Sequence, residues 1–563
     1  MIYHCEDHTC NYWDEGEKLP ERCPQCGRKL LRANEADMTG DDWTALGNTL
    51  WDAEASDKKR MVDCFRKAAY LGSAWGVCNL GICMEQGNGV EADPVQAFWL
   101  YQQAVEMGSL NAVCCLGVCY QYGIGTAPDA KQAAELYCKA AEYGSPRGQM
   151  LLARAFHDGI GVEADAAEAV YWVRAAAYQR YGEGMHRLGV CYEYGDGVEQ
   201  NWEHAVHWFR EAAESGVSVA MADLGYCYEK GCGVEQSWEQ AFSWYRRGAE
   251  CGYPVSMSNL GLCYKRGYGV DQNWQEAIKW YEQGAQCGDL QSMNNLAYCY
   301  ERGEGVEQNE DRALYWYRRG AEAGSVDCMF CLGWNYSNGE GVEQNMTEAI
   351  RWYTAAAEGG NAAAMHSLGW HYDHGEGVEQ DMKKAICWYE RAAEQNHPAA
   401  MNSLGECYAM GRGVPRDLET AMEWYRRAAE LGEAMADYNM GWHLEQAGKL
   451  SEAYAHYRKA ADGNDDSAWW ALGRFYENGV VVAQDGKEAR RCYETGEKLG
   501  SVKCKMRLAR CKLLGIGGRR EKKAGLDLCR QALELAKESS EKEDYGYEAE
   551  MNLLRRTIAE NES

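Results

Sequence analysis

The sequence has no long apolar run and no excess of positive charge. None of its 563 residues falls in a stretch approaching 18 consecutive apolar residues, so we expect no segment to cross a membrane. The first residues, Met1 to Cys5, begin no secretory signal. The formal net charge is −28, which argues against sequence-independent binding of nucleic acid and against docking on anionic lipid, since both need a basic surface. We therefore expect a soluble, cytoplasmic protein that does not bind membranes.

What the sequence has instead is a repeat of 36 residues. The clearest copy is residues 220–252, AMADLGYCYEKGCGVEQSWEQAFSWYRRGAECG, and it recurs with small changes at 256–288 and 292–324. A leucine, followed by glycine in most repeats, marks the phase, and weaker copies bring the total to about fourteen. A fixed period of this length predicts a solenoid of stacked supersecondary units. The regular phase marks are Leu80, Leu116, Leu152, Leu188, Leu224, Leu260, Leu296, Leu332, Leu368, Leu404 and Met440, and the weaker ones are Leu46, Leu472 and Leu508.

Each repeat divides into two short helices at a pair of glycines. In the clearest copy Met221, Leu224 and Tyr228 form one apolar helical stripe, which we call helix A. Gly231 then supplies the positive φ that ends a helix, and Gly233 lets the chain turn back. A capping residue follows and opens the second helix, helix B. The predicted caps are Asn201, Ser237, Asn273, Asn309, Asn345, Asp381 and Asp417.

Small residues recur at fixed positions and predict close packing between helices. A mid-helix glycine such as Gly225 costs about 1 kcal/mol relative to alanine, so its recurrence implies a neighbour too close for a methyl group. A tryptophan column is expected to fill space between the pairs. The alanine column of helix B is Ala205, Ala241, Ala277, Ala313, Ala349, Ala385 and Ala421. The tryptophan column is Trp208, Trp244, Trp280, Trp316, Trp352, Trp388 and Trp424.

This pattern, AxxxLGxxYxxGxGVxxDxxxAxxWYxxAAxxG, resembles the Sel-one-like repeat (SLR) family, a relative of the tetratricopeptide repeats. The resemblance covers roughly residues 41–535. It implies an all-α fold, a right-handed α-solenoid of about fourteen antiparallel helix pairs. It also implies an adaptor or scaffold for other proteins, without catalytic residues.

The 26 cysteines do not predict a disulfide framework. One cysteine lies three residues after the phase mark in many repeats, where equivalent positions of stacked helices should be about 8–10 Å apart, too far for a bridge. We interpret these as small buried hydrophobic residues with reduced thiols. They are Cys83, Cys119, Cys191, Cys227, Cys263, Cys299 and Cys407.

Residues 1–35 lie outside the repeat and predict a small zinc ribbon. Cys5 and Cys10 form one pair and Cys23 and Cys26 a second, enough thiolates for one tetrahedral structural zinc ion. The segment LPERCPQCG resembles the second half of a rubredoxin-like zinc ribbon. The first pair is spaced by four residues rather than two, which leaves open whether His4 or His8 replaces a cysteine. Zinc is favoured over iron because the site needs no redox role.

The remaining domain boundaries follow from where the repeat begins and ends. Residues 36–40 are predicted to be a linker, residues 41–518 the repeat superhelix, and residues 519–563 C-terminal helices that cap the stack. An interaction tail is the alternative for the last helix.

Three patterns that can carry chemistry have simpler explanations here. The Gly-x-Gly segments join two helices and recur through the chain, so they are turns rather than phosphate loops. Cys328 and Cys331 have redox spacing but lie inside a helix, where core packing is the favoured interpretation. Among His366, His371 and His374, no pair has the i, i+4 spacing of a helical metal site.

The candidate binding residues lie where the repeat does not dictate the side chain. Counted from the phase mark, positions −2, +2 and +6 of helix A share one face, which lines the concave surface in related superhelices. Aromatic residues edged with His, amide and basic groups occupy it, a composition typical of protein-binding hot spots. Packing against the neighbouring helix A is the alternative. The predicted residues are Tyr226, Tyr298, Arg302, Phe330, Trp334, His366, Trp370, His374, Tyr438 and Trp442.

The sequence thus predicts a non-catalytic adaptor that binds a peptide or helix of a protein partner in a concave groove. Basic residues beside the aromatic ones favour an acidic segment, and we expect a monomer. Two alternatives stay open: a β-lactam-like small-molecule binder or weak hydrolase, which the resemblance permits, and nucleic-acid contact through the zinc ribbon.

Overall fold

A computed structural model gives the fold of the chain. The structure describes residues 2–5, 13–15, 30–32, 35–51, 55–542 and 548–562. It divides into two compact units, 1–292 and 293–563, which we call the N-terminal half and the C-terminal half. Each half is described by itself.

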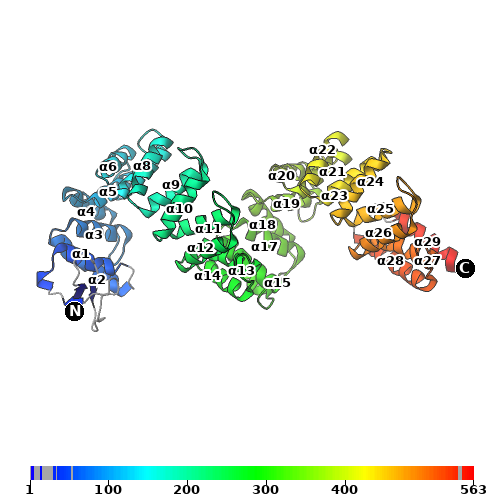
Figure 1. Cartoon of the computed structure of the whole chain (residues 1–563), viewed down its shortest axis with the longest axis horizontal. Helices are drawn as coiled ribbons and strands as arrows, with labels where there is room; N and C mark the ends of the chain where they lie inside the picture. Colours follow the sequence, from blue (N-terminus) through cyan, green and yellow to red (C-terminus); the bar gives the residue numbers. More distant parts are fainter. Residues whose placement is uncertain are drawn as a thin grey trace. The chain divides into compact units, whose positions relative to one another are not determined.

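The described residues form three short strands, one 3-10 helix and 29 α-helices (Figure 1). The strands pair antiparallel in the order β2-β1-β3. Their bounds are β1 Ile2–Cys5, β2 Trp13–Glu15 and β3 Leu30–Arg32, and the 3-10 helix is Glu35–Asp37. The α-helices are α1 Gly40–Thr49, α2 Ala55–Tyr70, α3 Ala74–Gln86, α4 Pro94–Glu106, α5 Leu110–Tyr122, α6 Ala130–Glu142, α7 Pro146–Asp158, α8 Ala166–Tyr178, α9 Gly182–Tyr194, α10 Trp202–Glu214, α11 Ser218–Lys230, α12 Trp238–Glu250, α13 Pro254–Arg266, α14 Trp274–Gln286, α15 Leu290–Arg302, α16 Glu310–Glu322, α17 Val326–Asn338, α18 Met346–Glu358, α19 Ala362–His374, α20 Met382–Glu394, α21 Pro398–Met410, α22 Leu418–Glu430, α23 Ala434–Gln446, α24 Leu450–Asp462, α25 Asp466–Asn478, α26 Gly486–Lys498, α27 Val502–Leu514, α28 Lys522–Lys542 and α29 Glu548–Glu562.

The odd-numbered helices from α1 to α27 are the A helices and the even-numbered ones from α2 to α28 are the B helices. The prediction of an all-helical repeat solenoid is confirmed: helix pairs such as α11 and α12, or α19 and α20, pack on each other and on the next pair. At the end of the C-terminal half, α29 lies against α27 and α28, where Leu554 is buried beside Met506 and Leu513. An ion pair of 2.7 Å between Arg507 and Glu550 joins α27 to α29.

The predicted helix ends are confirmed in the clearest repeat. Gly231 has φ +74° and its N–H donates to the Cys227 carbonyl at 2.9 Å, closing α11. Gly233 also has positive φ, and the Trp202 carbonyl of the preceding repeat leaves no room there for a Cβ. The Ser237 hydroxyl then accepts the Gln240 N–H at 3.3 Å and starts α12.

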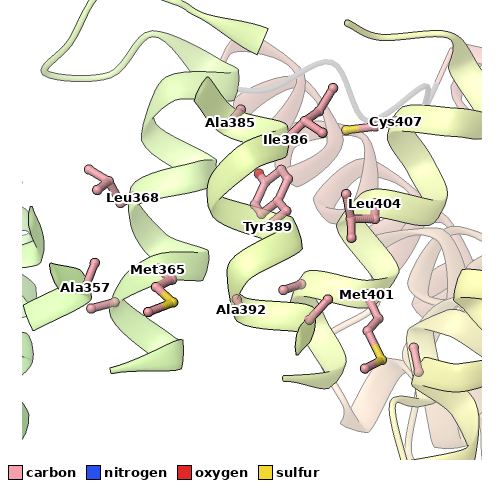
Figure 2. Close-up of a cluster of buried hydrophobic side chains, with 14 of the residues drawn as sticks. Ala357, Met365, Leu368, Ala385, Ile386, Tyr389, Ala392, Met401, Leu404 and Cys407 are labelled. Carbon is pink, nitrogen blue, oxygen red and sulfur yellow. The ribbon is translucent and has the colours of Figure 1, made fainter. Parts of the chain in front are cut away.

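An aromatic ring at the centre of helix B, a tyrosine in most repeats, forms the deepest part of the repeat's core. Figure 2 shows Tyr389 of α20 between the helix that carries Leu368 and the helix that carries Leu404, and all three are about 1% exposed or less. Because a tyrosine ring buries a large apolar area, each such ring is a principal source of hydrophobic stabilisation. The fully buried rings are Tyr101, Tyr137, Tyr245, Tyr281, Tyr317, Tyr353, Tyr389, Tyr425, Tyr457, Tyr493, Phe65 and Phe209.

The mid-helix glycine exists because this ring lies on it. A Cβ at Gly225 would be 2.6 Å from the Tyr245 ring, so the close approach predicted from the sequence is confirmed. The buried hydroxyl is satisfied within the same repeat, since Tyr245 donates to Glu229 at 2.8 Å. Where alanine replaces the glycine, at Ala297, the ring of Tyr317 is still buried, and its hydroxyl bond to Glu301 is 3.3 Å.

The alanine and tryptophan columns differ in depth. The predicted alanine column is buried throughout, from Ala205 to Ala421. The tryptophan before the tyrosine is only partly buried in most of these repeats. In four of them an arginine three residues later lies over its ring, at 4.3 Å for Arg391 over Trp388. The fully buried place thus belongs to the tyrosine, while the tryptophan lies at the edge of the core.

Candidate protein-interaction face

Successive A helices are joined through one pair of positions. The residue two before the phase mark of one repeat meets the residue one before the phase mark of the next, 37 positions later. His186 lies 2.7 Å from Asp223, His366 lies 3.3 Å from Ser403, and Asn439 donates to Asn402 at 3.0 Å. Position −2 is therefore part of the packing between neighbouring A helices.

The predicted binding residues therefore fall into two groups. Those at position −2 point toward the core. Phe330, His366 and Tyr438 are partly buried, and each ring packs on the central tyrosine of a helix B at 5.6 to 5.9 Å. For these three residues the structure shows the packing role that the sequence analysis left as an alternative.

The residues at position +2 point outward. The exposed fraction is 48% for Trp334 and 38% for both Tyr298 and Trp442, while Trp370 is partly buried under a stacked His374 ring 4.3 Å away. These four residues, all in the C-terminal half, form what we call the aromatic row. Exposed tryptophans and tyrosines present a large apolar area that a partner can cover.

The predicted cations lie beside these rings. The Arg302 guanidinium is 5.8 Å from the Tyr298 ring, and both belong to α15. In the N-terminal half, Tyr226 is 44% exposed, and the Lys230 ammonium is 5.7 Å from its ring and 2.7 Å from the Glu229 carboxylate. Each pair presents an aromatic face with a positive charge at its edge.

An ionic cluster that the sequence analysis did not predict interrupts the row between Trp370 and Trp442. Arg412 lies 2.9 Å from the buried Asp373 carboxylate and 3.7 Å from Glu406, which occupies position +2 of its repeat. Burial raises the pKa of Glu406, and Asn402 and Asn439 both donate to its carboxylate. The only sequence signal was Glu406 at a position that is aromatic in the adjoining repeats.

The histidines of this region are packing residues in the described structure. Burial, followed by the nearby His397, lowers the pKa of His366 to about 4, and the two rings stack at 5.2 Å. Burial also lowers the pKa of His371. His374 is exposed and its Nδ1 lies 2.9 Å from the Trp370 carbonyl, so it supports the aromatic row.

The predicted burial of the cysteines that follow the phase mark is confirmed. Burial raises the pKa of the Cys328 thiol to about 11 and that of Cys331 to about 12, which fits core packing rather than a reactive dithiol. Cys115 differs: a hydrogen bond from Cys78 lowers the pKa of its thiol, and Arg147 donates to its sulfur at 3.6 Å.

The predicted zinc ligands Cys10, Cys23 and Cys26 lie outside the described residues, as do the alternative ligand His8 and the side chains of His4 and Cys5. Cys5 ends strand β1. Within the residues that the structure describes, no group of three or more His, Cys, Asp or Glu side chains is placed to hold a metal ion. Across the same residues, every helix is too short or too polar to span a bilayer.

Comparison with known proteins agrees with this architecture. The Sel1 repeat model matches 13 consecutive segments between residues 76 and 537. One similar solved structure is a protective antigen present in uropathogenic Escherichia coli strains that displays an SLR fold. It is 29% identical, with 76% of this chain and 94% of that chain covered and a TM-score of 0.52. A Sel1 repeat protein from Oxalobacter formigenes is 32% identical, covering 43% of this chain and 96% of that one, with a TM-score of 0.40. No curated protein matches the sequence. The matched segments are 76–109, 112–145, 146–181, 182–217, 218–253, 254–289, 290–325, 326–361, 362–397, 398–433, 434–465, 468–501 and 502–537.

Proposed function

The chain belongs to the Sel1 repeat family, and on that basis we propose that it is a non-catalytic adaptor that binds a protein partner on the face of its A helices. Sel1 repeat proteins are generally scaffolds for protein interactions. The finer part of the proposal is the binding mode: an extended peptide or a helix of the partner covers the aromatic row.

The observation that carries the proposal is the exposure of Tyr298, Trp334 and Trp442, which occupy the same position of helix A in three repeats. The residues at position −2 of the same helices pack against neighbouring helices. The aromatic rings at position +2 remain partly exposed to solvent. Large rings presented on rigid helices lose little conformational entropy on binding, which is why they dominate protein interfaces. Arg302 beside Tyr298 favours a carboxylate on the partner.

The packing of the A helices supports a concave binding face. In the N-terminal half α1 contacts α3, α3 contacts α5, α5 contacts α7 and α11 contacts α13, and in the C-terminal half α25 contacts α27. In the described part of the chain, no two successive B helices make a comparable contact. The helices that approach one another lie on the inner side of a curved stack, so a right-handed superhelix with A helices lining its groove is part of the proposal.

The test compares partner capture by the wild type with capture by a Trp334→Ala/Trp442→Ala variant. Each truncation of a hot-spot ring is expected to cost about 1–4 kcal/mol of binding free energy, so the double variant should bind at least about tenfold more weakly. Partners would be captured by crosslinking in native lysate, identified, and their Kd values measured with purified protein.

The matched control is Tyr171→Ala/Tyr315→Ala, which removes two rings of similar exposure, 61% and 55%, from B helices. The control should bind like the wild type. If the A-face variant keeps wild-type affinity for every captured partner, or if the control loses as much, the aromatic row is not the binding surface.

The zinc ribbon of residues 1–35 is a second proposal, with Cys5, Cys10, Cys23 and Cys26 holding one structural ion. A segment this short has almost no core, so the metal would supply its folding energy. We expect one zinc per chain by elemental analysis and none in a Cys23→Ser/Cys26→Ser variant. The matched control is Cys251→Ser/Cys287→Ser, two exposed cysteines of the repeats, which should retain the ion. Iron in place of zinc, or full metal content in the first variant, would contradict the proposal.

We also propose that the protein is a cytoplasmic monomer.

A further inference from the structure

Two repeats lack the ring that fills the others. In the repeat of Leu152, helix α8 carries Trp172-Val173 where six repeats have Trp-Tyr, so Val173 stands in the place of Tyr137 and Phe209 in the repeats on either side. The second such position is Cys529 of α28, and there Leu554 of the additional helix α29 joins the same buried cluster. No added helix accompanies Val173.

A cavity of about 360 Å³ lies at this position, between α7, α8 and α9 of the N-terminal half. Its apolar wall includes Ala153, Val170, Val173 and Cys191, all of which belong to buried core. In the ring-bearing repeats the tyrosine lies against the residue equivalent to Ala153, as Tyr245 does against Gly225. The missing ring explains why the cavity reaches down to this wall, although its residues are only 2–3% exposed.

The cavity's mouth has polar groups where a ring's hydroxyl would be. His157 stands at the position of Glu229, the acceptor for the Tyr245 hydroxyl in its own repeat. Its Nδ1 is 2.7 Å from Asp158 and its Nε2 is 3.2 Å from Asp196, and Arg187 lies 3.7 Å from the same Asp196 carboxylate. A polar substituent entering here would find carboxylate acceptors and a guanidinium donor within one small area.

We infer that this cavity binds a single aromatic ring of phenol size, with the ring on Val173 and Ala153 and its hydroxyl at the His157–Asp196 pair. The ligand would provide the aromatic ring that helix B itself provides in the other repeats. The volume suits one ring with a short substituent, since small-molecule pockets begin at about 300 Å³ and combine apolar walls with a few polar groups. The inference is independent of the aromatic row, because it concerns α7 to α9 alone.

Two sources can provide such a ring, a free phenolic compound or a tyrosine of a bound protein. The test therefore uses two probes with the full-length chain: p-cresol, which is the tyrosine side chain itself, and N-acetyl-L-tyrosinamide, which adds the flanking peptide groups. Titration calorimetry should give a Kd on the order of 0.1–1 mM for p-cresol. Binding of p-cresol alone indicates a free phenol as the natural ligand, and binding of both admits a partner's tyrosine.

Filling the cavity from within should abolish binding. Val173→Tyr restores the repeat's own ring, and the Ala297–Tyr317 pair shows that a ring can lie against alanine at this place. We expect this variant to lose p-cresol affinity by at least about tenfold and to melt at a higher temperature, since it fills a cavity. If Val173→Tyr alone does not fold, Ala153→Gly/Val173→Tyr reproduces the Gly225–Tyr245 arrangement. The matched control Phe209→Tyr adds a hydroxyl to a ring already in place and should bind p-cresol like the wild type.

Two results would overturn the inference. The first is the absence of any p-cresol binding to the wild type at millimolar concentration, which would mean that the cavity holds only water. The second is undiminished p-cresol binding to folded Val173→Tyr, which would place the probe elsewhere on the chain.

Discussion

Replacing Tyr317 by alanine is expected to destabilise its part of the array by about 3–5 kcal/mol, the cost of removing a large ring from a well-packed core. The ring is 1% exposed and packs at the centre of its repeat. Its loss would also leave the Glu301 carboxyl, whose pKa burial already raises, without the hydroxyl that donates to it at 3.3 Å. The effect should be local first, because each repeat is stabilised only by itself and its neighbours.

Urea unfolding and amide hydrogen exchange of α16 and α17 would measure this effect. The control is Tyr315→Ala, the same substitution two residues earlier on α16, where the side chain is 55% exposed. Exposed substitutions usually change stability by no more than about 0.5 kcal/mol. Equal losses in the two variants would contradict the assignment of the helix B tyrosine as the centre of the core.

Acidification is expected to destabilise the C-terminal half through His366. The folded-state pKa of His366 is about 4, below the value of 6.5 that applies when the chain unfolds, because burial disfavours the charged ring. Between these pH values the unfolded state binds the proton and the folded state does not, so stability falls as the pH falls from 6.5 to 4. The shift corresponds to about 3 kcal/mol over that range.

The measurement is the urea midpoint at pH 7, 5 and 4 for the wild type and for His366→Asn. Asparagine carries no titratable group, so this variant should lose less stability on acidification than the wild type does. His397, whose pKa burial also lowers, stacks on His366, and Ser403 and Tyr389 complete its surroundings. The control is His374→Asn, because the His374 side chain is exposed. If His366→Asn and His374→Asn keep the same pH dependence as the wild type, His366 is not held neutral by burial.

The sequence by itself determined the repeat, the two helices of each unit and the points where they begin and end. Gly231 and Ser237 show why: the positive φ of one and the capping hydroxyl of the other act within a few residues of the chain. The alanine column was also predictable from its recurrence. The mid-helix glycine was predictable because a residue that is unfavourable in a helix is kept only for a close contact. The same local signals led to the Sel1 repeat family.

Only the tertiary structure decided which side chains face outward. Positions −2 and +2 lie on one face of an isolated helix A, yet Phe330 is drawn onto a neighbouring ring while Trp334 is left exposed. The difference depends on how closely the next helix A approaches, and that distance is a property of the stack rather than of one helix. The cavity at Val173 is likewise a property of how neighbouring helices pack. A Trp-Val pair is visible in the sequence, but only the structure shows that α7, α8 and α9 leave a cavity where the ring is missing.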